Sequence, residues 1–154
     1  MIVLGADPGT VKFGWAAIDT ETMEAVDLGV ILPPKKQAKQ FRLKYIALAL
    51  KGIFEKIRPD EAAVEDQFIG NNARSGIAIG TAKGVFTAIA ALHGIEVSEY
   101  PATTVKKEAT RKGGATKDAV TRAMQAFFHL PSTPDEDAAD ALAVALAHWR
   151  LSNA

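Results

Sequence analysis

Two aspartates near the C-terminus stand where a carboxylate is costly. Asp137 and Asp140 are three residues apart in a segment with helical character, so they lie on roughly the same face. Between residues 138 and 149 the only polar residues are Asp140 and His148, which predicts a helix that is buried on every side. A buried carboxylate destabilises a fold unless a cation pairs with it, and no Lys or Arg lies within one turn. The pair indicates a metal site; the alternative is that Asp140 caps a neighbouring backbone segment.

The start of this helix has its own sequence signal. Thr133 precedes Pro134, and Glu136 follows three residues after Thr133, which is the pattern of an N-cap, a first helical residue and a capping box. Acids in a first turn also complement the helix dipole. Helix initiation therefore explains Asp135 and Glu136, but it does not explain Asp140.

Two further acids are candidates for the same site. Asp7 follows an apolar run at residues 2–6, and Glu65 follows another at residues 62–64. Both runs are typical of short buried strands. Functional groups collect at the carboxyl ends of parallel strands, so we expect Asp7 and Glu65 to lie near Asp137 and Asp140.

The composition is that of an ordinary globular domain. The chain has 154 residues, of which 48% are hydrophobic and 23% charged, and we expect a single domain over residues 1–154. It has no cysteine, which excludes disulfides, zinc–thiolate sites and thiol catalysis. The first apolar run meets Asp7 too early for a signal peptide, and no apolar stretch is predicted to span a bilayer. A cytoplasmic protein is expected.

Charge is distributed unevenly although the net charge is zero. Residues 35–58 carry eight Lys or Arg and one acid, and residues 106–122 carry six Lys or Arg and two acids. Basic patches of this kind favour binding of a polyanion such as nucleic acid. On charge alone, a solvated helix face is an equally good explanation.

The order of predicted elements indicates an α/β fold. Strands are predicted at residues 2–6, 13–19, 25–32, 62–64 and 95–100, and helices at 37–57, 75–93, 116–128 and toward the C-terminus. Residues 101–117 are predicted to be a polar, basic connection. An antiparallel meander that leads into parallel strands predicts a mixed five-stranded sheet flanked by helices.

Two of these helices carry patterns with consequences for packing. In the first, Phe41, Tyr45, Leu48 and Ile53 recur at helical spacing opposite Lys and Arg, which predicts the buried face. In the second, Gly76, Gly80 and Gly84 recur at every fourth residue. Three glycines cost a helix about 3 kcal/mol relative to alanine, so we expect another helix or backbone to approach this face; random sequence drift is the alternative.

Taken together, the segments resemble the RuvC family of bacterial Holliday-junction resolvases, within the RNase H-like superfamily. The resemblance follows family order over almost the whole chain, in Gly-Ala-Asp-Pro-Gly-Thr at 5–10, Gly-Trp at 14–15, and residues 59–65, 68–80, 83–84 and 137–143. It implies a homodimeric, structure-specific endodeoxyribonuclease. Such an enzyme resolves four-way DNA junctions by paired hydrolysis of phosphodiester bonds in recombination and repair. Members work beside a junction-binding and branch-migration motor complex, RuvA and RuvB.

The resemblance also implies the site. Asp7, Glu65, Asp137 and Asp140 correspond to the family's four catalytic acids, with Mg²⁺ or Mn²⁺ as cofactor. Oxygen ligands suit these hard cations, and four carboxylates can hold two of them with positions open for phosphate and water. We expect Asp7 to bridge both ions, Glu65 to bind one, and Asp137 with Asp140 to bind the other.

Basic and aromatic residues complete the implied site. Lys106 is expected to stabilise charge on the phosphate, and Phe68 to stack on an unpaired base for about 1–3 kcal/mol. The alternatives are a solvated lysine pair at 106–107 and a Phe68 side chain that folds into the core. The expected DNA-binding residues are Phe68, Asn72, Arg74, Lys83, Lys107, Arg111, Lys112 and Lys117. Residues 111–118 depart from the family's usual loop before the second active-site lysine.

Three other functions compete with this one. The Asp-x-Gly-Thr motif at residues 7–10, followed by Gly14, also resembles the first phosphate loop of actin and sugar-kinase ATP-binding proteins. Those proteins are far longer and repeat the motif in a second domain. An RNase H-like nuclease that processes RNA is closer, but the segment at 72–84 and the Asp137/Asp140 pair favour the junction resolvases. A non-catalytic DNA-binding module has no use for a buried Asp140.

Overall fold

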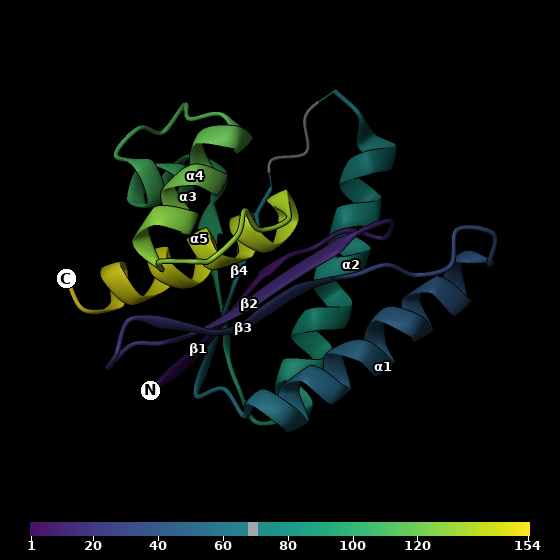
Figure 1. Ribbon diagram of the computed structural model, residues 1–154. Helices are drawn as coiled ribbons and strands as arrows, with labels where there is room; N and C mark the ends of the chain where they lie inside the picture. The colour runs from purple at the N-terminus through teal and green to yellow at the C-terminus, as the bar shows by residue number, and fades with distance from the viewer. Residues whose placement is uncertain (68–70) are drawn as a thin grey trace.

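A mixed five-stranded sheet forms the centre of the computed structural model, which describes residues 1–67 and 71–154 (Figure 1). The strands are β1 (Ile2–Asp7), β2 (Phe13–Asp19), β3 (Glu24–Ile31), β4 (Glu61–Asp66) and β5 (Val97–Pro101), in the spatial order β3-β2-β1-β4-β5. β2 pairs antiparallel with both β1 and β3, whereas β4 pairs parallel with both β1 and β5. The predicted antiparallel meander followed by parallel strands is confirmed.

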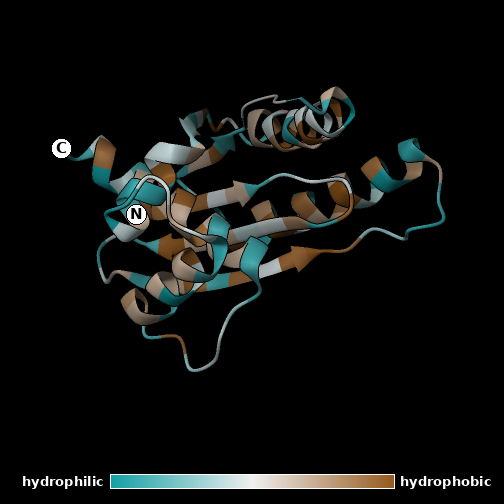
Figure 2. Cartoon of the chain, turned by 90° about the horizontal axis from the view of Figure 1, so that it is seen from above, coloured by the Kyte–Doolittle hydropathy of each residue, from teal (hydrophilic) through white to brown (hydrophobic). Residues whose placement is uncertain are grey.

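Helices cover both faces of this sheet. They are α1 (Lys39–Ile57), α2 (Ala73–Leu92), α3 (Ala102–Thr110), α4 (Lys117–Phe127) and α5 (Glu136–Ser152). One apolar core joins α3, α4 and α5 to the face that includes Val3, and the other joins α1 and α2 to the face that includes Leu4. Figure 2 shows apolar residues along the strands that lie between the helices of the two faces. β1 is therefore buried on both sides, as its uninterrupted apolar run predicts.

The helix α5 lies against the middle of the sheet and is buried from Ala138 to His148 apart from Asp140. Glycines on two strands allow this close approach. A Cβ atom on Gly5 would lie 2.2 Å from the carbonyl oxygen of Ala141, and one on Gly14 would lie 2.1 Å from that of Asp137. The two glycines therefore let the first turn of α5, with its aspartates, rest directly on β1 and β2.

The predicted start of α5 is wrong by two residues. The N-cap is Asp135, whose carboxylate accepts a hydrogen bond of 2.9 Å from the backbone N–H of Asp137. Thr133 instead donates its hydroxyl to the side chain of Gln125 at 3.2 Å. An ion pair of 2.7 Å between Lys12 and Asp135 helps to select the later cap, and this contact comes from a segment far away in the sequence.

Residues 102–110, predicted as a polar connection, form the helix α3. Val105 is the only buried residue of this helix, so the segment offers no repeated apolar positions from which a helix would be predicted. That side chain joins the core beneath α5, and the contact with α5 holds the helix in place. Tertiary packing has overridden a weak local signal here.

The face of α1 predicted to be buried is exposed to solvent. Of the four residues predicted to form it, Phe41, Tyr45 and Leu48 are 50%, 45% and 59% exposed, and only Ile53 packs, partly buried, against the core. The fully buried residues of α1 are Ile46, Leu50 and Phe54. The buried set is spaced by four residues and satisfies the helical period equally well. Periodicity alone does not distinguish two apolar stripes on one helix.

The helix α2 also differs from expectation. By length and composition alone, α2 is apolar enough to cross a membrane, so the prediction that no such stretch exists is wrong. Of its most apolar 18-residue segment, 22% is buried within the protein. Ala82, Phe86 and Ala90 pack into the core beside α1. Within the described residues, nothing lies within 4 Å of a Cβ built on Gly80 or Gly84, so the expected close approach does not occur inside one chain.

Candidate active site

Three carboxylates from two elements meet at one edge of the sheet. Asp7 ends β1, and Asp137 and Asp140 lie in the first turns of α5. Each offers an oxygen atom, and these atoms lie within 4.8 Å of one another. Asp7 is only 7% exposed, and the side chains of Asp137 and Asp140 are 19% and 20% exposed. The group is compact enough to hold a cation and open enough to receive a substrate.

Glu65 lies beside this group without belonging to the tight cluster. It comes from β4, which pairs in parallel with β1, and it lines the same cavity of about 350 Å³ as Asp7 and Asp140. The side-chain amide of Gln67 donates to Oδ1 of Asp7 at 3.3 Å and to Oε2 of Glu65 at 3.1 Å. Sequence reasoning missed Gln67. Its position two residues after Glu65 was the available signal, because alternate residues of an extended segment face the same side.

Electrostatics make this cluster unfavourable without a cation. Burial, reinforced by the neighbouring carboxylates of Asp140 and Glu65, raises the pKa of Asp7 to about 8. Burial is also the main cause that raises the pKa of Glu65 and of Asp140. Because each charged carboxylate disfavours the next, a bound cation would relieve both desolvation and mutual repulsion. Carboxylate oxygens are the ligands that hard divalent cations prefer, so the residues fit a metal site.

Two lysines from other elements partly neutralise the acids. Nζ of Lys117, on α4, lies 3.3 Å from Asp140 and 3.6 Å from Asp137. Nζ of Lys12, in the turn between β1 and β2, lies 3.2 Å from Asp137 and 2.7 Å from Asp135. Neither lysine lies within one helical turn of Asp140 in the sequence, because tertiary structure brings both to the acids. Lys117 was expected near the site only from the family resemblance, and Lys12 was not predicted. Within residues 1–67 and 71–154, Asp140 accepts no backbone hydrogen bond, which removes the capping alternative.

Lys106 lines the same cavity as Lys117. It lies on α3, and its positive charge acts to lower the pKa of Glu65 against the larger effect of burial. The adjacent Lys107 is exposed and does not line the cavity. The geometry therefore separates the two members of the 106–107 pair.

The remaining predicted DNA-binding residues do not gather in one place. The side chain of Asn72 caps α2 by accepting from the backbone N–H of Ser75 at 3.2 Å. Lys83 makes ion pairs of 3.1 Å with Asp66 and 2.7 Å with Glu99. Arg74 lines a different cavity, between α1 and α2.

Arg111 and Lys112 follow α3 and are exposed, and Arg111 has a left-handed backbone with φ of 67°. Phe68 lies outside the described residues, so its stacking role stays a prediction.

The sequence model of one protein family, described as crossover junction endodeoxyribonuclease RuvC, matches residues 3–148. The chain belongs to the RuvC family. It is 36% identical over 151 residues to the RuvC of Chloroflexus aggregans, covering 96% of this chain and 92% of the relative. It is 40% identical over 149 residues to the RuvC of Xanthobacter autotrophicus, covering 95% and 88%.

Solved structures agree with RuvC membership. A structure of Thermus thermophilus RuvC in complex with Holliday junction substrate matches with a TM-score of 0.89 and 26% identity, covering 99% of this chain and 94% of that one. The yeast mitochondrial Holliday junction resolvase Ydc2 matches with a TM-score of 0.66 at 13% identity, which supports the fold alone. The predicted RNase H-like fold and the RuvC resemblance are both confirmed. The protein is a nuclease of the crossover junction endodeoxyribonuclease class, and the ATP-binding and RNA-processing alternatives are set aside.

Proposed function

We propose that this protein resolves four-way DNA junctions by hydrolysing one phosphodiester bond at each of two active sites. Asp7, Glu65, Asp137 and Asp140 are its metal ligands in this proposal. The observation that carries it is the cluster of three carboxylate oxygens within 4.8 Å, in a chain of the RuvC family.

The acids suit a pair of Mg²⁺ or Mn²⁺ ions. Such ions supply an activated water and stabilise the charge that develops on the phosphate oxygens. Asp7 is the most buried of the acids, its carboxylate is close to that of Asp140, and it shares the side-chain amide of Gln67 with Glu65. This central position supports Asp7 as the ligand shared by both ions. Asp137 and Asp140, on α5, would then hold one ion, and Glu65, on β4, would hold the other.

Lysines complete the catalytic machinery in this proposal. Lys117 occupies the space in front of Asp137 and Asp140, and Lys106 lines the same cavity. Ammonium groups at this edge offset the negative charge of the entering phosphate and of the leaving oxygen. The exposed residues Lys107, Arg111 and Lys112 lie on or after α3 and are suited to bind the flanking DNA backbone.

The chain is proposed to act as a homodimer. Two equivalent strands of a junction are cut in pairs, and this requires two sites related by a two-fold axis. The helix α2 supports such a contact: Ile77 is 60% exposed, and the positions of Gly80 and Gly84 are open, while Ala82 and Phe86 face the core. An exposed apolar helix with small residues on its outer face allows a second copy to approach closely.

Replacing one glycine on this face tests the interface. Gly80→Leu is expected to convert the protein from dimer to monomer in sedimentation velocity, because the larger side chain would overfill the contact. Gly52→Leu on α1, where nothing lies within 4 Å of a built Cβ, is the matched control and should stay dimeric. A dimeric Gly80→Leu protein would place the interface elsewhere.

We also propose that residues 1–154 act as one nuclease domain in the cytoplasm, beside the RuvA and RuvB motor complex. The match of one family model to residues 3–148 supports a single functional unit.

A comparison of four substrates tests the function itself. The protein, with Mg²⁺ or Mn²⁺, is incubated separately with a labelled four-way junction, a linear duplex of the same sequence, an RNA stem and ATP. We expect symmetric nicks in opposite strands of the junction and little change in the other three. Consumption of RNA or ATP with an intact junction would overturn the proposal.

A further inference from the structure

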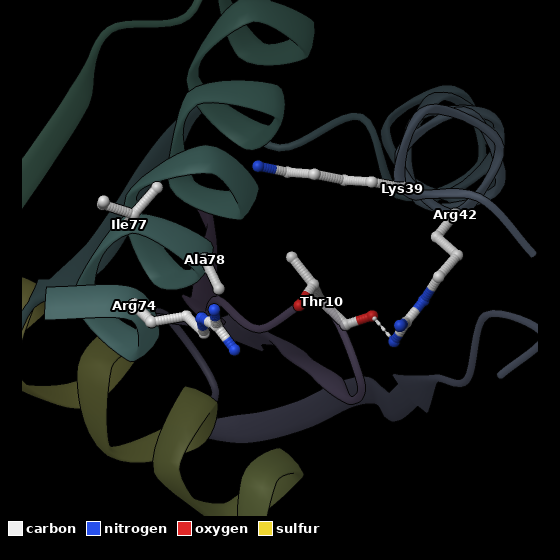
Figure 3. A pocket seen from close by; sticks show the side chains of 6 residues that line it. All are labelled: Thr10, Lys39, Arg42, Arg74, Ile77 and Ala78. Carbon is white, nitrogen blue, oxygen red and sulfur yellow. Dashed lines mark hydrogen bonds between the residues drawn. The ribbon is translucent and has the colours of Figure 1, made fainter. Parts of the chain in front are cut away.

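A second cavity, of about 470 Å³, lies between α1, α2 and the turn that joins β1 to β2 (Figure 3). It is lined by Thr10, Lys39, Arg42, Arg74, Ile77 and Ala78. None of these residues lines the cavity that holds Asp7 and Glu65. The two cavities are therefore separate sites on the same protein.

The lining of this cavity is strongly cationic. Lys39 and Arg42 come from α1 and Arg74 from α2, and no acidic residue among those that the structure describes lines the cavity. Both helices begin here, at Lys39 and at Ala73, and neither has an acid in its first turn. Helix N-termini carry partial positive charge, so the helix ends add to the attraction that the three side chains exert on an anion.

One of the three cationic side chains is anchored by a hydrogen bond, and the other two extend from α1 and α2. A guanidinium nitrogen, Nη2, of Arg42 donates to the backbone carbonyl of Thr10 at 2.6 Å. Its Nε–H is buried and has no hydrogen-bond partner in the part of the chain that the structure describes. Figure 3 shows Lys39 extending from α1 toward α2, and Arg74 pointing from α2 toward Thr10. Arg42 is thus anchored at one end, and the other two side chains converge from the opposite walls.

The turn between β1 and β2 links this cavity to the acids. Asp7 begins the turn, Thr10 lines the cationic cavity, and Lys12 contacts Asp137 at 3.2 Å. Because this turn borders both cavities, a DNA strand that runs along it would pass over both. The small apolar Ala78 lies on α2 near Arg74 and leaves room for a bound group, and the cations suit a phosphate.

We propose that this cavity binds a backbone phosphodiester of the DNA substrate, separate from the phosphodiester that is cut, through Lys39, Arg42 and Arg74. The inference rests on the proposed function, because it takes DNA as the substrate. Holding a second phosphate fixes the register of the strand relative to the acids, since contacts to the backbone position a nucleic acid without reading its sequence.

The first test measures how junction affinity depends on salt. Binding of a four-way junction without divalent metal is titrated over a range of NaCl concentrations for the wild type, Lys39→Gln and Arg74→Gln. Loss of one phosphate contact should reduce the slope of log affinity against log salt by about 0.9. Lys56→Gln is the matched control: it removes the same charge from α1 about 25 Å along the helix axis and should leave the slope unchanged.

The second test removes charge from the DNA in place of the protein. Junctions that carry one neutral methylphosphonate are compared, position by position, with the natural junction. At one position in each equivalent DNA strand, the methylphosphonate should lower the affinity of the wild type. The same methylphosphonate should hardly lower the affinity of Lys39→Gln and Arg74→Gln, because these variants already lack the contact.

Two results would overturn the proposal. One is a salt dependence in which the slope for Lys39→Gln equals that of the wild type, or in which Lys56→Gln lowers the slope as much as Lys39→Gln does. The other is full additivity between each variant and every methylphosphonate position. Neither result touches the cleavage of junctions by the wild type, so failure of this site is distinguishable from failure of the proposed function.

Discussion

Asp7→Asn is expected to lower junction cleavage by several powers of ten. The substitution keeps the shape of the side chain but removes the charge of the most central acid, which adjoins both Asp140 and Glu65. If Asp7 is shared by both ions, the loss of its charge weakens the binding of both ions at once. Single-turnover cleavage of a labelled junction with Mg²⁺ or Mn²⁺ measures the effect.

Junction binding separates this loss from a loss of affinity. Without metal, Asp7→Asn should bind the junction as well as the wild type or more tightly, because a negative charge that faces the phosphates is gone. The control is Asp135→Asn. Asp135 caps α5, and Asn caps a helix equally well, so cleavage by this variant should change little. Wild-type cleavage by Asp7→Asn would contradict the metal site at its centre.

The same variant should change how stability depends on pH. The pKa of Asp7 is about 8 in the folded protein against an ordinary value of 3.8, so the fold favours its protonated form. The unfolded state therefore loses the proton first, and the metal-free wild type should lose stability as pH rises from about 4 to about 8. Asp7→Asn lacks this contribution. Denaturant unfolding in EDTA at pH 5 and pH 8 should show a smaller loss for the variant than for the wild type.

Gly14→Ala is expected to destabilise the fold and to disable the site together. The added Cβ would lie 2.1 Å from the carbonyl oxygen of Asp137 and 2.4 Å from its carbonyl carbon. These are backbone atoms of a buried helix, so α5 must move away from β2. Overfilling of this kind costs about 1–3 kcal/mol or more. A displacement of Asp137 by about 1 Å should reduce cleavage by about a hundredfold even in protein that remains folded.

The control for this substitution is Gly52→Ala. Gly52 lies within α1, and nothing lies within 4 Å of a Cβ built there, so alanine should raise helix stability by up to about 1 kcal/mol. Urea unfolding and cleavage should be measured for both variants. If Gly14→Ala unfolds and cleaves like the wild type, contact between α5 and β2 is not what positions Asp137.

Much of the candidate site was predictable because its signals are local. Asp7 and Glu65 follow apolar runs that end at the same edge of the sheet, and this parallel arrangement follows from the order of elements. Asp140 stands out because it interrupts an otherwise apolar helix. The structure brings the oxygens of Asp7, Asp137 and Asp140 within 4.8 Å, with Glu65 in the same cavity.

Residues that support these acids were not predictable in the same way. Lys12 and Lys117 contact Asp137 from a turn and from α4, at positions 125 and 20 residues away in the chain. The cavity formed by α1 and α2 joins Thr10 to Lys39 and Arg74, which no spacing rule connects. Such contacts depend on how elements pack, and sequence periodicity carries no information about them.

The sequence by itself determined the mixed sheet, the order of its elements and the acids at its edge, because strand alternation, helical period and strand ends are properties of neighbouring residues. Only the tertiary structure decided which stripe of α1 is buried, that residues 102–110 form a helix, and where α5 begins. Phe41 and Leu50 fit helical stripes equally well, and only Leu50 meets the sheet. Asp135 replaces Thr133 as the cap while it is paired with Lys12, more than a hundred residues earlier. Each of these outcomes is set by contacts between distant segments, and their free energies exceed the small differences in local preference.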